Sequence, residues 1–302
     1  MSVNGDPRWP SAASLLTASA TTARSHLSLV GIHTFESSLT PRSATSTPVA
    51  VRAALARYST YSYDDDLDLA DHIDIVDHGD VHNPDGPGGA ERVRDAVTHI
   101  DVGDGPLAIL GGDNAATYLA MSALAGNQIE RWGLITFDAH LDLREGESNG
   151  SPIRQLLEAG LDGHHVVQVG LADFSNSAHY AARARAAGMT AISRAQLRTR
   201  PIADVVDEAL SIAGSGGRPV YVDIDLDVVD RAAVPGCPAA TPGGMSPDEL
   251  RQAGRLLARD PRVRAVDLTE IDVERDSDDQ RTVRLAALVL LEICAGLLRR
   301  PL

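Results

Sequence analysis

The sequence carries two short acidic motifs whose residue types and spacing suit metal chemistry. The first, Asp138-Ala-His140-Leu-Asp142, directly follows the apolar run 134–137. Residues two apart in an extended segment point the same way, so the aspartates and the histidine can converge on one point. An imidazole between two carboxylates is a typical arrangement for a divalent metal. The alternative is a capped turn that contains an unrelated histidine.

The second motif places three aspartates at alternate positions, Asp223, Asp225 and Asp227, after the apolar run 220–222. Like charges side by side on a strand repel each other. A buried carboxylate without a partner is unfavourable by several kcal/mol unless a raised pKa neutralises it. A bound cation relieves both effects. The alternative is an edge strand whose acidic face is open to solvent.

Two other predicted strand ends carry weaker signals. Gly111 and Gly112 permit a tight turn before Asp113 and Asn114. A plain strand-to-helix turn capped by Asp or Asn explains this segment equally well. Glu270 follows another apolar run, where its carboxylate could orient a cationic substrate, although this residue alone indicates little.

The two acidic motifs together supply one histidine and at least four aspartates. Hard oxygen ligands combined with a single imidazole favour Mn²⁺ over Zn²⁺, with Mg²⁺ and Fe²⁺ as alternatives. Two such ions that share carboxylates would activate a water molecule and clamp the attacked atom. The sequence therefore predicts a hydrolase with a pair of divalent ions at the ends of parallel strands.

Short apolar strands alternate with helices along the chain, which indicates βαβ units and a parallel sheet. Ligands of such sheets lie at the carboxyl ends of the strands, where both acidic motifs fall. The predicted fold is α/β, a single-domain three-layer α/β/α architecture with a mostly parallel, doubly wound sheet. We expect strands at 27–32, 73–76, 107–110, 132–137, 166–169, 190–192, 219–224 and 263–271. We expect helices at 49–58, 90–100, 115–124, 153–159, 178–187, 202–212, 247–259 and 282–299.

No Gly/Ser linker, internal repeat or heptad pattern divides the sequence. Residues 1–26 are expected to be an N-terminal lead-in segment and residues 27–302 one α/β domain. Residues 11–29 show no clean strand pattern and fit a helix. The segment 36–47 is rich in Ser, Thr and Pro, which predicts a loop. The charges of 64–66 predict a solvated turn.

The 302-residue chain has a formal net charge of −15. This acidity disfavours nucleic acid and anionic membranes as partners, because their phosphates would be repelled. Neither a G-x-x-x-x-G-K-[ST] nor a G-x-G-x-x-G motif is present, which argues against phosphate-loop and dinucleotide enzymes. The first residues lack an apolar signal core, no run of 18 apolar residues occurs, and the two cysteines form no C-x-x-C pair. A cytoplasmic protein is therefore expected.

The motifs, in this order, resemble those of the ureohydrolases, the arginase and agmatinase superfamily, over roughly residues 27–298. The first acidic motif is similar to the D-A-H-x-D motif of that family. Residues 225–230, followed by Pro235-Gly236, are similar to its D-x-D-x-x-D…PG motif, and Glu270 to the glutamate on its last core strand. Within the superfamily, Arg144 and the segments 148–152, 174–177, 235–239 and 242–245 resemble the formimidoylglutamases.

This resemblance implies an arginase-like fold and two Mn²⁺ ions per subunit. Asn114 stands where most of the superfamily has a histidine, so this possible sixth ligand would be weaker and one ion loosely held. Asp223 falls where the family usually has serine and is expected behind the ligands. Relatives form trimers or hexamers, which implies a homo-oligomer. The other implied metal ligands are Asp138, His140, Asp142, Asp225 and Asp227.

The implied reaction is hydrolysis of the linear amidine N-formimidoyl-L-glutamate to L-glutamate and formamide, a step of histidine degradation. Asp142 would take and return a proton, and Glu270 would bind the cationic amidinium. Arg144 would hold a substrate carboxylate bidentately, although a surface ion pair also explains this residue. Asn149, which stands where arginases have a histidine, and Ser177 are the remaining expected substrate contacts.

Two other functions fit the same motifs. One is a ureohydrolase that releases urea from a guanidino acid, such as guanidinobutyrate or arginine. Arg144 argues against agmatine, which has no carboxylate to pair with it. The other is a metal-poor, non-catalytic member of the family, which Asn114 and Asn149 would favour.

Overall fold

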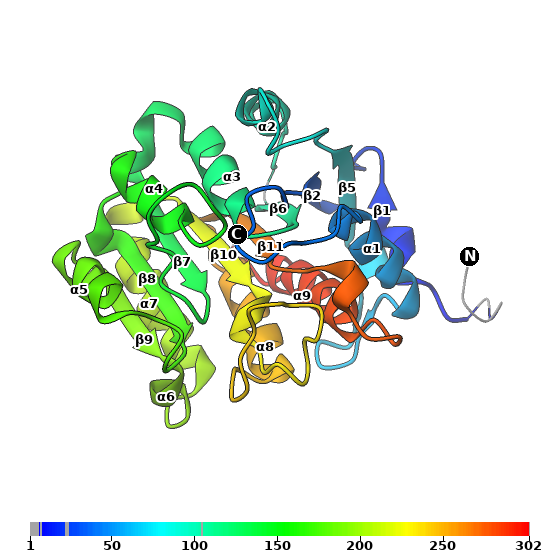
Figure 1. Cartoon of the computed structure of the whole chain (residues 1–302). Coiled ribbons are helices and arrows are strands. Elements are labelled where there is room, and N and C mark those ends of the chain that lie inside the picture. The colour runs from blue at the N-terminus through cyan, green and yellow to red at the C-terminus, as the bar shows by residue number, and fades with distance from the viewer. Residues whose placement is uncertain (1–5, 7, 22–23, 104, 302) are drawn as a thin grey trace.

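The computed structural model describes residues 6, 8–21, 24–103 and 105–301. Within these residues nine strands form one sheet in the order β1-β5-β2-β6-β11-β10-β7-β8-β9, and all neighbouring strands are parallel. In Figure 1 the sheet extends from β1 on the right to β9 on the left. Its strands are β1 (Leu16–Thr17), β2 (Ser25–Ile32), β5 (Ile73–Asp80), β6 (Leu107–Gly111), β7 (Gly133–Phe137), β8 (Val166–Leu171), β9 (Thr190–Ser193), β10 (Val220–Asp225) and β11 (Val263–Thr269).

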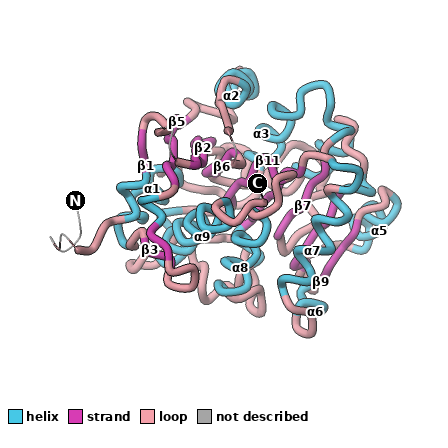
Figure 2. Tube along the Cα trace, turned by 180° about the vertical axis from the view of Figure 1, so that it is seen from behind, coloured by secondary structure: helices cyan, strands magenta, loops and turns pink. Residues whose placement is uncertain are grey.

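Helices cover both faces of this sheet, as the opposite views of Figures 1 and 2 show. One apolar core lies between the sheet and α1, α7, α8 and α9, and a second lies between the other face and α2, α3 and α4. The central strands are apolar on both sides because both faces are covered. The helices are α1 (Thr47–Ala54), α2 (Gly89–Thr98), α3 (Ala115–Ala125), α4 (Pro152–Glu158), α5 (Ala178–Ala186), α6 (Arg194–Leu197), α7 (Ile202–Ala213), α8 (Pro247–Ala258) and α9 (Arg281–Leu297).

The prediction of a three-layer α/β/α fold with a parallel sheet is confirmed. Each strand expected from the sequence is present, and so is each expected helix except the one over 11–29, with most ends displaced by no more than two or three residues. The largest differences are in β5, which continues to Asp80 instead of ending at residue 76, and in α1, which ends at Ala54 instead of residue 58. The sheet places the ends of β6, β11, β10 and β7 side by side, and these are the strands that precede or carry the predicted site residues.

The helix predicted over 11–29 is wrong. The described part of this segment contains a short 3-10 helix, η1 (Ala12–Leu15), then β1, and then the start of β2. The two residues of β1 are too few for a period-2 pattern to appear, although they pair with β5 at the end of the sheet. The charged turn at 64–66 joins a small antiparallel hairpin, β3 (Tyr61–Ser62) and β4 (Leu67–Asp68), which was not predicted.

Within the described ranges, no helix combines the length and the apolar character that crossing a bilayer requires.

Candidate metal centre and substrate cavity

The predicted site residues meet where four neighbouring central strands end. Asn114 follows β6, Asp138 follows β7, Asp225 ends β10 and Glu270 follows β11. All four residues are buried. Their carboxylates and amide therefore come together at the carboxyl end of a parallel sheet, the usual place for ligands in open α/β folds.

The first acidic motif reaches its geometry through a turn. β7 ends at Phe137, and the backbone N–H of His140 donates to Asp138 Oδ1 at 2.6 Å. Asp142 has a φ of 51°, in the left-handed region that few non-glycine residues adopt. The expectation of an extended segment with alternating side chains is therefore wrong for 138–142, although the side chains still converge.

The second acidic motif ends a fully buried central strand. β10 lies between β11 and β7, and none of its residues is exposed. The alternative of a solvated edge strand is therefore wrong. Asp227 does not continue the strand, because it lies in a 3-10 helix, η7 (Leu226–Val228), where its N–H donates to Asp225 Oδ1 at 2.8 Å.

Three overlapping groups of side chains lie close enough to hold metal ions. Within each group the candidate ligand atoms all lie within 4.8 Å of one another. Asp138, Asp225 and Asp227 each belong to two groups, so neighbouring ions would share carboxylates. The groups are Asp138 with His140 and Asp227, Asp138 with Asp142 and Asp225, and Asp225 with Asp227 and Glu270.

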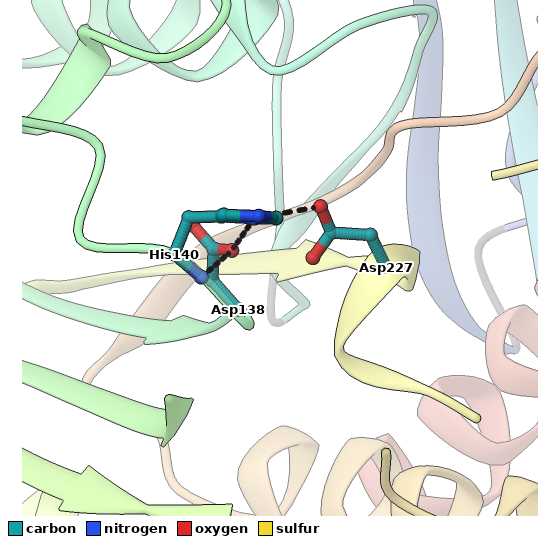
Figure 3. A group of neighbouring side chains, drawn as sticks. All are labelled: Asp138, His140 and Asp227. Carbon is teal, nitrogen blue, oxygen red and sulfur yellow. Dashed lines mark hydrogen bonds and ion pairs between the residues drawn. The ribbon is translucent and has the colours of Figure 1, made fainter. Parts of the chain in front are cut away.

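His140 lies between two of these carboxylates (Figure 3). Its Nδ1 is 2.9 Å from Asp227 Oδ2 and 3.4 Å from Asp138 Oδ1. Burial alone would lower the pKa of His140, but the two carboxylates outweigh burial and raise this pKa to about 12. When no metal ion is bound, a protonated His140 would thus balance part of the negative charge of the cluster.

The remaining carboxyl groups are poorly compensated. Burial, together with the charge of Asp227, raises the pKa of Asp138 to about 7. Burial and neighbouring carboxylates also raise the pKa values of Asp142 and Asp225 well above the ordinary range. Burial alone would raise the pKa of Asp227. The charge of His140 and several hydrogen bonds together outweigh burial, so this pKa is lowered. Without a further cation, the cluster must therefore retain protons.

The donor set fits divalent cations. Asp138 Oδ2 is buried and has no hydrogen-bond partner in the part of the chain that the structure describes. An ionised carboxylate oxygen in that position is unfavourable unless a cation binds it. Carboxylate oxygens with one imidazole suit Mn²⁺, Mg²⁺ or Fe²⁺. The side chains of the three groups are thus chemically suited to a pair of such ions.

Asn114 adjoins the cluster through its amide. Its Nδ2 donates to Asp142 Oδ2 at 2.8 Å, and its Oδ1 accepts from the hydroxyls of Thr117 at 2.7 Å and Thr269 at 3.0 Å. In this orientation the amide oxygen faces the two hydroxyls and the N–H faces the carboxylate. The assignment of Asn114 as a metal ligand therefore stays a prediction.

Asp223 lies outside all three groups, behind Asp225. It is registered with Asp267 of β11, and burial and the charge of Asp267 raise its pKa well above the ordinary range. Asp267 in turn accepts hydrogen bonds from Tyr221 at 2.7 Å and Thr117 at 2.9 Å. This second layer of carboxyl and hydroxyl groups agrees with the expected position of Asp223 behind the ligands.

Glu270 is held in a strained position beside the cluster. Its φ is 64°, a left-handed value that costs a non-glycine residue about 1 kcal/mol or more. Its Oε1 accepts from the Asn114 backbone N–H at 3.0 Å and from Asn149 Nδ2 at 2.8 Å, and its Oε2 accepts from Arg42. Asn149 therefore contacts Glu270 directly, and a contact with substrate stays a prediction.

A cavity of about 220 Å³ opens onto the acidic cluster. Arg144 lines it, is exposed, and makes no ion pair with any residue in the described ranges, so the alternative of a surface ion pair finds no partner. Ser177 also lines the cavity, and its hydroxyl caps α5 by accepting from the Tyr180 N–H at 3.2 Å. The same cavity is thus lined by carboxylates of the acidic cluster and by a guanidinium without an ion-pair partner in the described ranges.

Sequence reasoning missed two residues of this site. Arg42 lines the cavity and pairs with Glu270, and Asn176 holds the first acidic motif in place. Asn176 Oδ1 accepts from the Leu141 N–H at 2.8 Å, and its Nδ2 donates to the Ala139 carbonyl at 3.0 Å. The Ser/Thr/Pro-rich composition around Arg42 predicted a loop but did not indicate that Arg42 belongs to the site. Asn176 lies inside a segment that already suggested the formimidoylglutamase branch.

Comparison with known proteins places this chain in a family. Residues 25–296 match the Arginase family, and the chain belongs to it. Within that family it is similar to formimidoylglutamases. The protein of that name from Halalkalibacterium halodurans is 36% identical over 278 residues, which make up 89% of this chain and 86% of that protein.

Solved structures agree. The crystal structure of formimidoylglutamase from Bacillus subtilis subsp. subtilis str. 168 matches with a TM-score of 0.89 and 29% identity, over 98% of this chain and 94% of that one. A Trypanosoma cruzi formiminoglutamase solved with Mn²⁺ has the same fold, with a TM-score of 0.83 and 21% identity over 97% of this chain and 100% of that one. The chain is thus an arginase-family hydrolase that resembles formimidoylglutamases.

Proposed function

We propose that this protein hydrolyses N-formimidoyl-L-glutamate to L-glutamate and formamide. The observation that supports this most strongly is the pairing of two features in one cavity. Members of the acidic cluster, which is suited to divalent cations, line it, and so does the guanidinium of Arg144, which has no ion-pair partner among the described residues. A substrate with an amidine at one end and carboxylates at the other matches that distribution of charge.

The proposed metal ligands are the members of the three groups other than Glu270, which is assigned to the substrate, together with Asn114. A pair of Mn²⁺ ions, when bound there, would supply an activated water and stabilise charge that develops on the amidine. Asn114 is a weaker candidate, because its amide N–H and not its oxygen faces Asp142. The other proposed ligands are Asp138, His140, Asp142, Asp225 and Asp227.

The other roles belong to side chains of the cavity. Asp142, whose pKa burial and Asp138 raise, would take a proton from the water and return it to the leaving nitrogen. Glu270 would bind the cationic amidinium, and Arg144 a substrate carboxylate. Asn149 and Ser177 would complete the polar lining.

A panel of substrates tests this proposal. The protein loaded with Mn²⁺ is incubated separately with N-formimidoyl-L-glutamate, 4-guanidinobutyrate, arginine and agmatine, and formamide, urea and ammonia are measured. We expect formamide and L-glutamate in equal amounts from the first compound and little urea from the others. Urea from a guanidino acid, without formamide, would establish the alternative substrate. No product from any compound, together with no bound metal, would establish a non-catalytic protein.

We further propose that the protein acts in the cytoplasm as a homo-oligomer, a trimer or hexamer, without nucleic-acid or membrane partners. The formal charge of −15 supports the absence of nucleic-acid and membrane partners, because it disfavours phosphate-rich surfaces. Light scattering coupled to size-exclusion chromatography tests the oligomeric state.

A further inference from the structure

Arg42 is a cation buried inside the cavity, directly beside the acidic cluster. It lies in the loop between β2 and α1, and its side chain is 2% exposed, as is that of Glu270. Its Nη2 donates to Glu270 Oε2. The cavity thus contains two arginines, a buried one next to Glu270 and the exposed Arg144.

The guanidinium of Arg42 is only partly satisfied. Its Nε and Nη1 are buried and have no hydrogen-bond partner among the residues that the structure describes. Buried donors that form no hydrogen bond are unfavourable, because the loss of their hydration is not compensated. A carboxylate is a suitable ligand for this guanidinium, because Nη1 and Nη2 lie on one edge and can each donate to one carboxylate oxygen, Nη2 with the hydrogen that Glu270 does not take.

Asn149 also links the loop that carries Arg42 to the carboxylate of Glu270 through hydrogen bonds. Asn149 accepts from the Leu39 backbone N–H at 2.9 Å and donates to Glu270 at 2.8 Å. Arg42 and Asn149 therefore hold opposite oxygens of Glu270. This arrangement fixes the guanidinium before a ligand arrives, so little conformational entropy is lost on binding.

We propose that Arg42 binds the carboxylate attached to the same carbon as the substrate's amidine nitrogen. This inference rests on the proposed function, in which Glu270 binds the amidinium. Since Arg42 contacts Glu270, an anion on Arg42 lies close to a cation on Glu270. N-formimidoyl-α-amino acids have this arrangement, because one carbon separates their amidine nitrogen from a carboxylate. In ω-guanidino acids a chain of methylenes separates the two charges.

The two arginines then have different roles. Arg42 selects for the near carboxylate, and Arg144, more exposed, binds the distal carboxylate of a dicarboxylic substrate. A dicarboxylic amidine fits both, whereas 4-guanidinobutyrate offers nothing to Arg42 and leaves its donors unpaired. Arg42 is thus a specificity-determining residue that discriminates between amidines of α-amino acids and other acidic amidines.

The test compares two substrates that differ only in the near carboxylate, N-formimidoyl-L-glutamate and 4-(formimidoylamino)butanoate. The Mn²⁺-loaded wild type and the variants Arg42→Met, Arg42→Lys and Arg57→Met are assayed with both. Arg57 is exposed and lies outside the cavity, so its variant is the matched control. Thermal melting checks that each variant is folded.

For Arg42→Met we expect kcat/KM to fall about a hundredfold with formimidoylglutamate and less than about threefold with the butanoate. Arg42→Lys keeps the charge beside Glu270 but loses the fork, so we expect about a tenfold fall with formimidoylglutamate only. If Arg42→Met does not fold, the lysine variant alone decides. Arg57→Met should leave both values unchanged.

Equal losses with both substrates would overturn the proposal, since Arg42 would then only position Glu270. An unchanged value with formimidoylglutamate would overturn it as well. If the wild type hydrolyses neither compound, the proposed function fails. The role of Arg42 is then measured by calorimetric binding of L-glutamate and 4-aminobutanoate. Weaker binding of glutamate alone to the Arg42 variants supports the proposal, and unchanged binding of glutamate overturns it.

Discussion

Asp138 is the residue on which the proposed metal site depends most. It belongs to two of the three candidate groups, and its Oδ2 is buried without a hydrogen-bond partner among the described residues. The motif that contains it was recognisable in the sequence, because chemistry of this kind requires particular residue types at short spacing. Single-residue substitutions there should therefore have large and specific effects.

Asp138→Asn should abolish high-affinity binding of both ions and lower activity at least about a thousandfold, because a neutral amide replaces a carboxylate shared by two groups. Metal content after Mn²⁺ loading and desalting is the measurement. Asp173→Asn is the matched control, since Asp173 is exposed and lies outside the candidate groups. Near-stoichiometric metal in the Asp138 variant would show that the ions lie elsewhere.

The two residues that sequence reasoning missed, Arg42 and Asn176, act through partners distant in the chain. Arg42 is 228 positions from Glu270, and Asn176 is 35 positions from Leu141. Spacing along a sequence carries no information about such contacts, which depend on how loops pack after folding. The metal-binding motifs were predictable because their partners are two residues apart. The left-handed backbone at Asp142 and Glu270 was not predictable, because neither is glycine.

At the scale of elements, strands of five or more residues and their helices were predictable from apolar runs and helix-start signals. For example, Ser246 is the N-cap of α8 and forms a capping box with Glu249, while Pro247 is in the first turn. The hairpin β3–β4 and strand β1 have two residues each, so periodicity could not reveal them. The order of the strands in the sheet depends on three-dimensional packing. The sequence therefore could not predict that the four strands contributing to the site are neighbours.

The connection after β7 depends on Asn176, which bonds both to Leu141 and to Ala139. Asn176→Ala should lower the affinity for Mn²⁺ about tenfold to a hundredfold, because supporting hydrogen bonds orient metal ligands. It should also lower the free energy of unfolding by about 1–3 kcal/mol. Isothermal titration with Mn²⁺ and denaturant unfolding measure the two effects.

Asn127→Ala, at an exposed position remote from the cavity, serves as the control for this substitution. Loss of stability in Asn176→Ala with unaltered Mn²⁺ affinity would show that the connection does not position the ligands.

At the scale of the whole molecule, the buried acidic cluster should make the stability of the metal-free protein depend on pH. The pKa of Asp138 is raised to about 7 and that of Asp267 to about 6, by burial first, so the folded chain keeps protons that the unfolded chain has released. The pKa of His140 is raised to about 12, so above its unfolded pKa this residue also keeps a proton that the unfolded chain has released. These contributions are complete below the unfolded pKa values and are lost as the pH rises through the folded ones.

We therefore expect the metal-free protein to melt several degrees higher at pH 5.5 than at pH 8. With saturating Mn²⁺ the order should reverse, because metal ions and protons compete for the same carboxylates. Scanning calorimetry at both pH values, with and without Mn²⁺, is the measurement. A metal-free protein that melts higher at pH 8 would contradict the electrostatic account of the cluster.

The central claim is that divalent cations neutralise this buried cluster. A calorimetric titration of the folded, metal-free protein with Mn²⁺ in buffers of different ionisation enthalpy tests it most directly. We predict binding of about two ions per chain, one more weakly than the other, with measurable release of protons from the carboxyl groups. Absence of binding to the folded protein, or binding without any release of protons, would contradict the account.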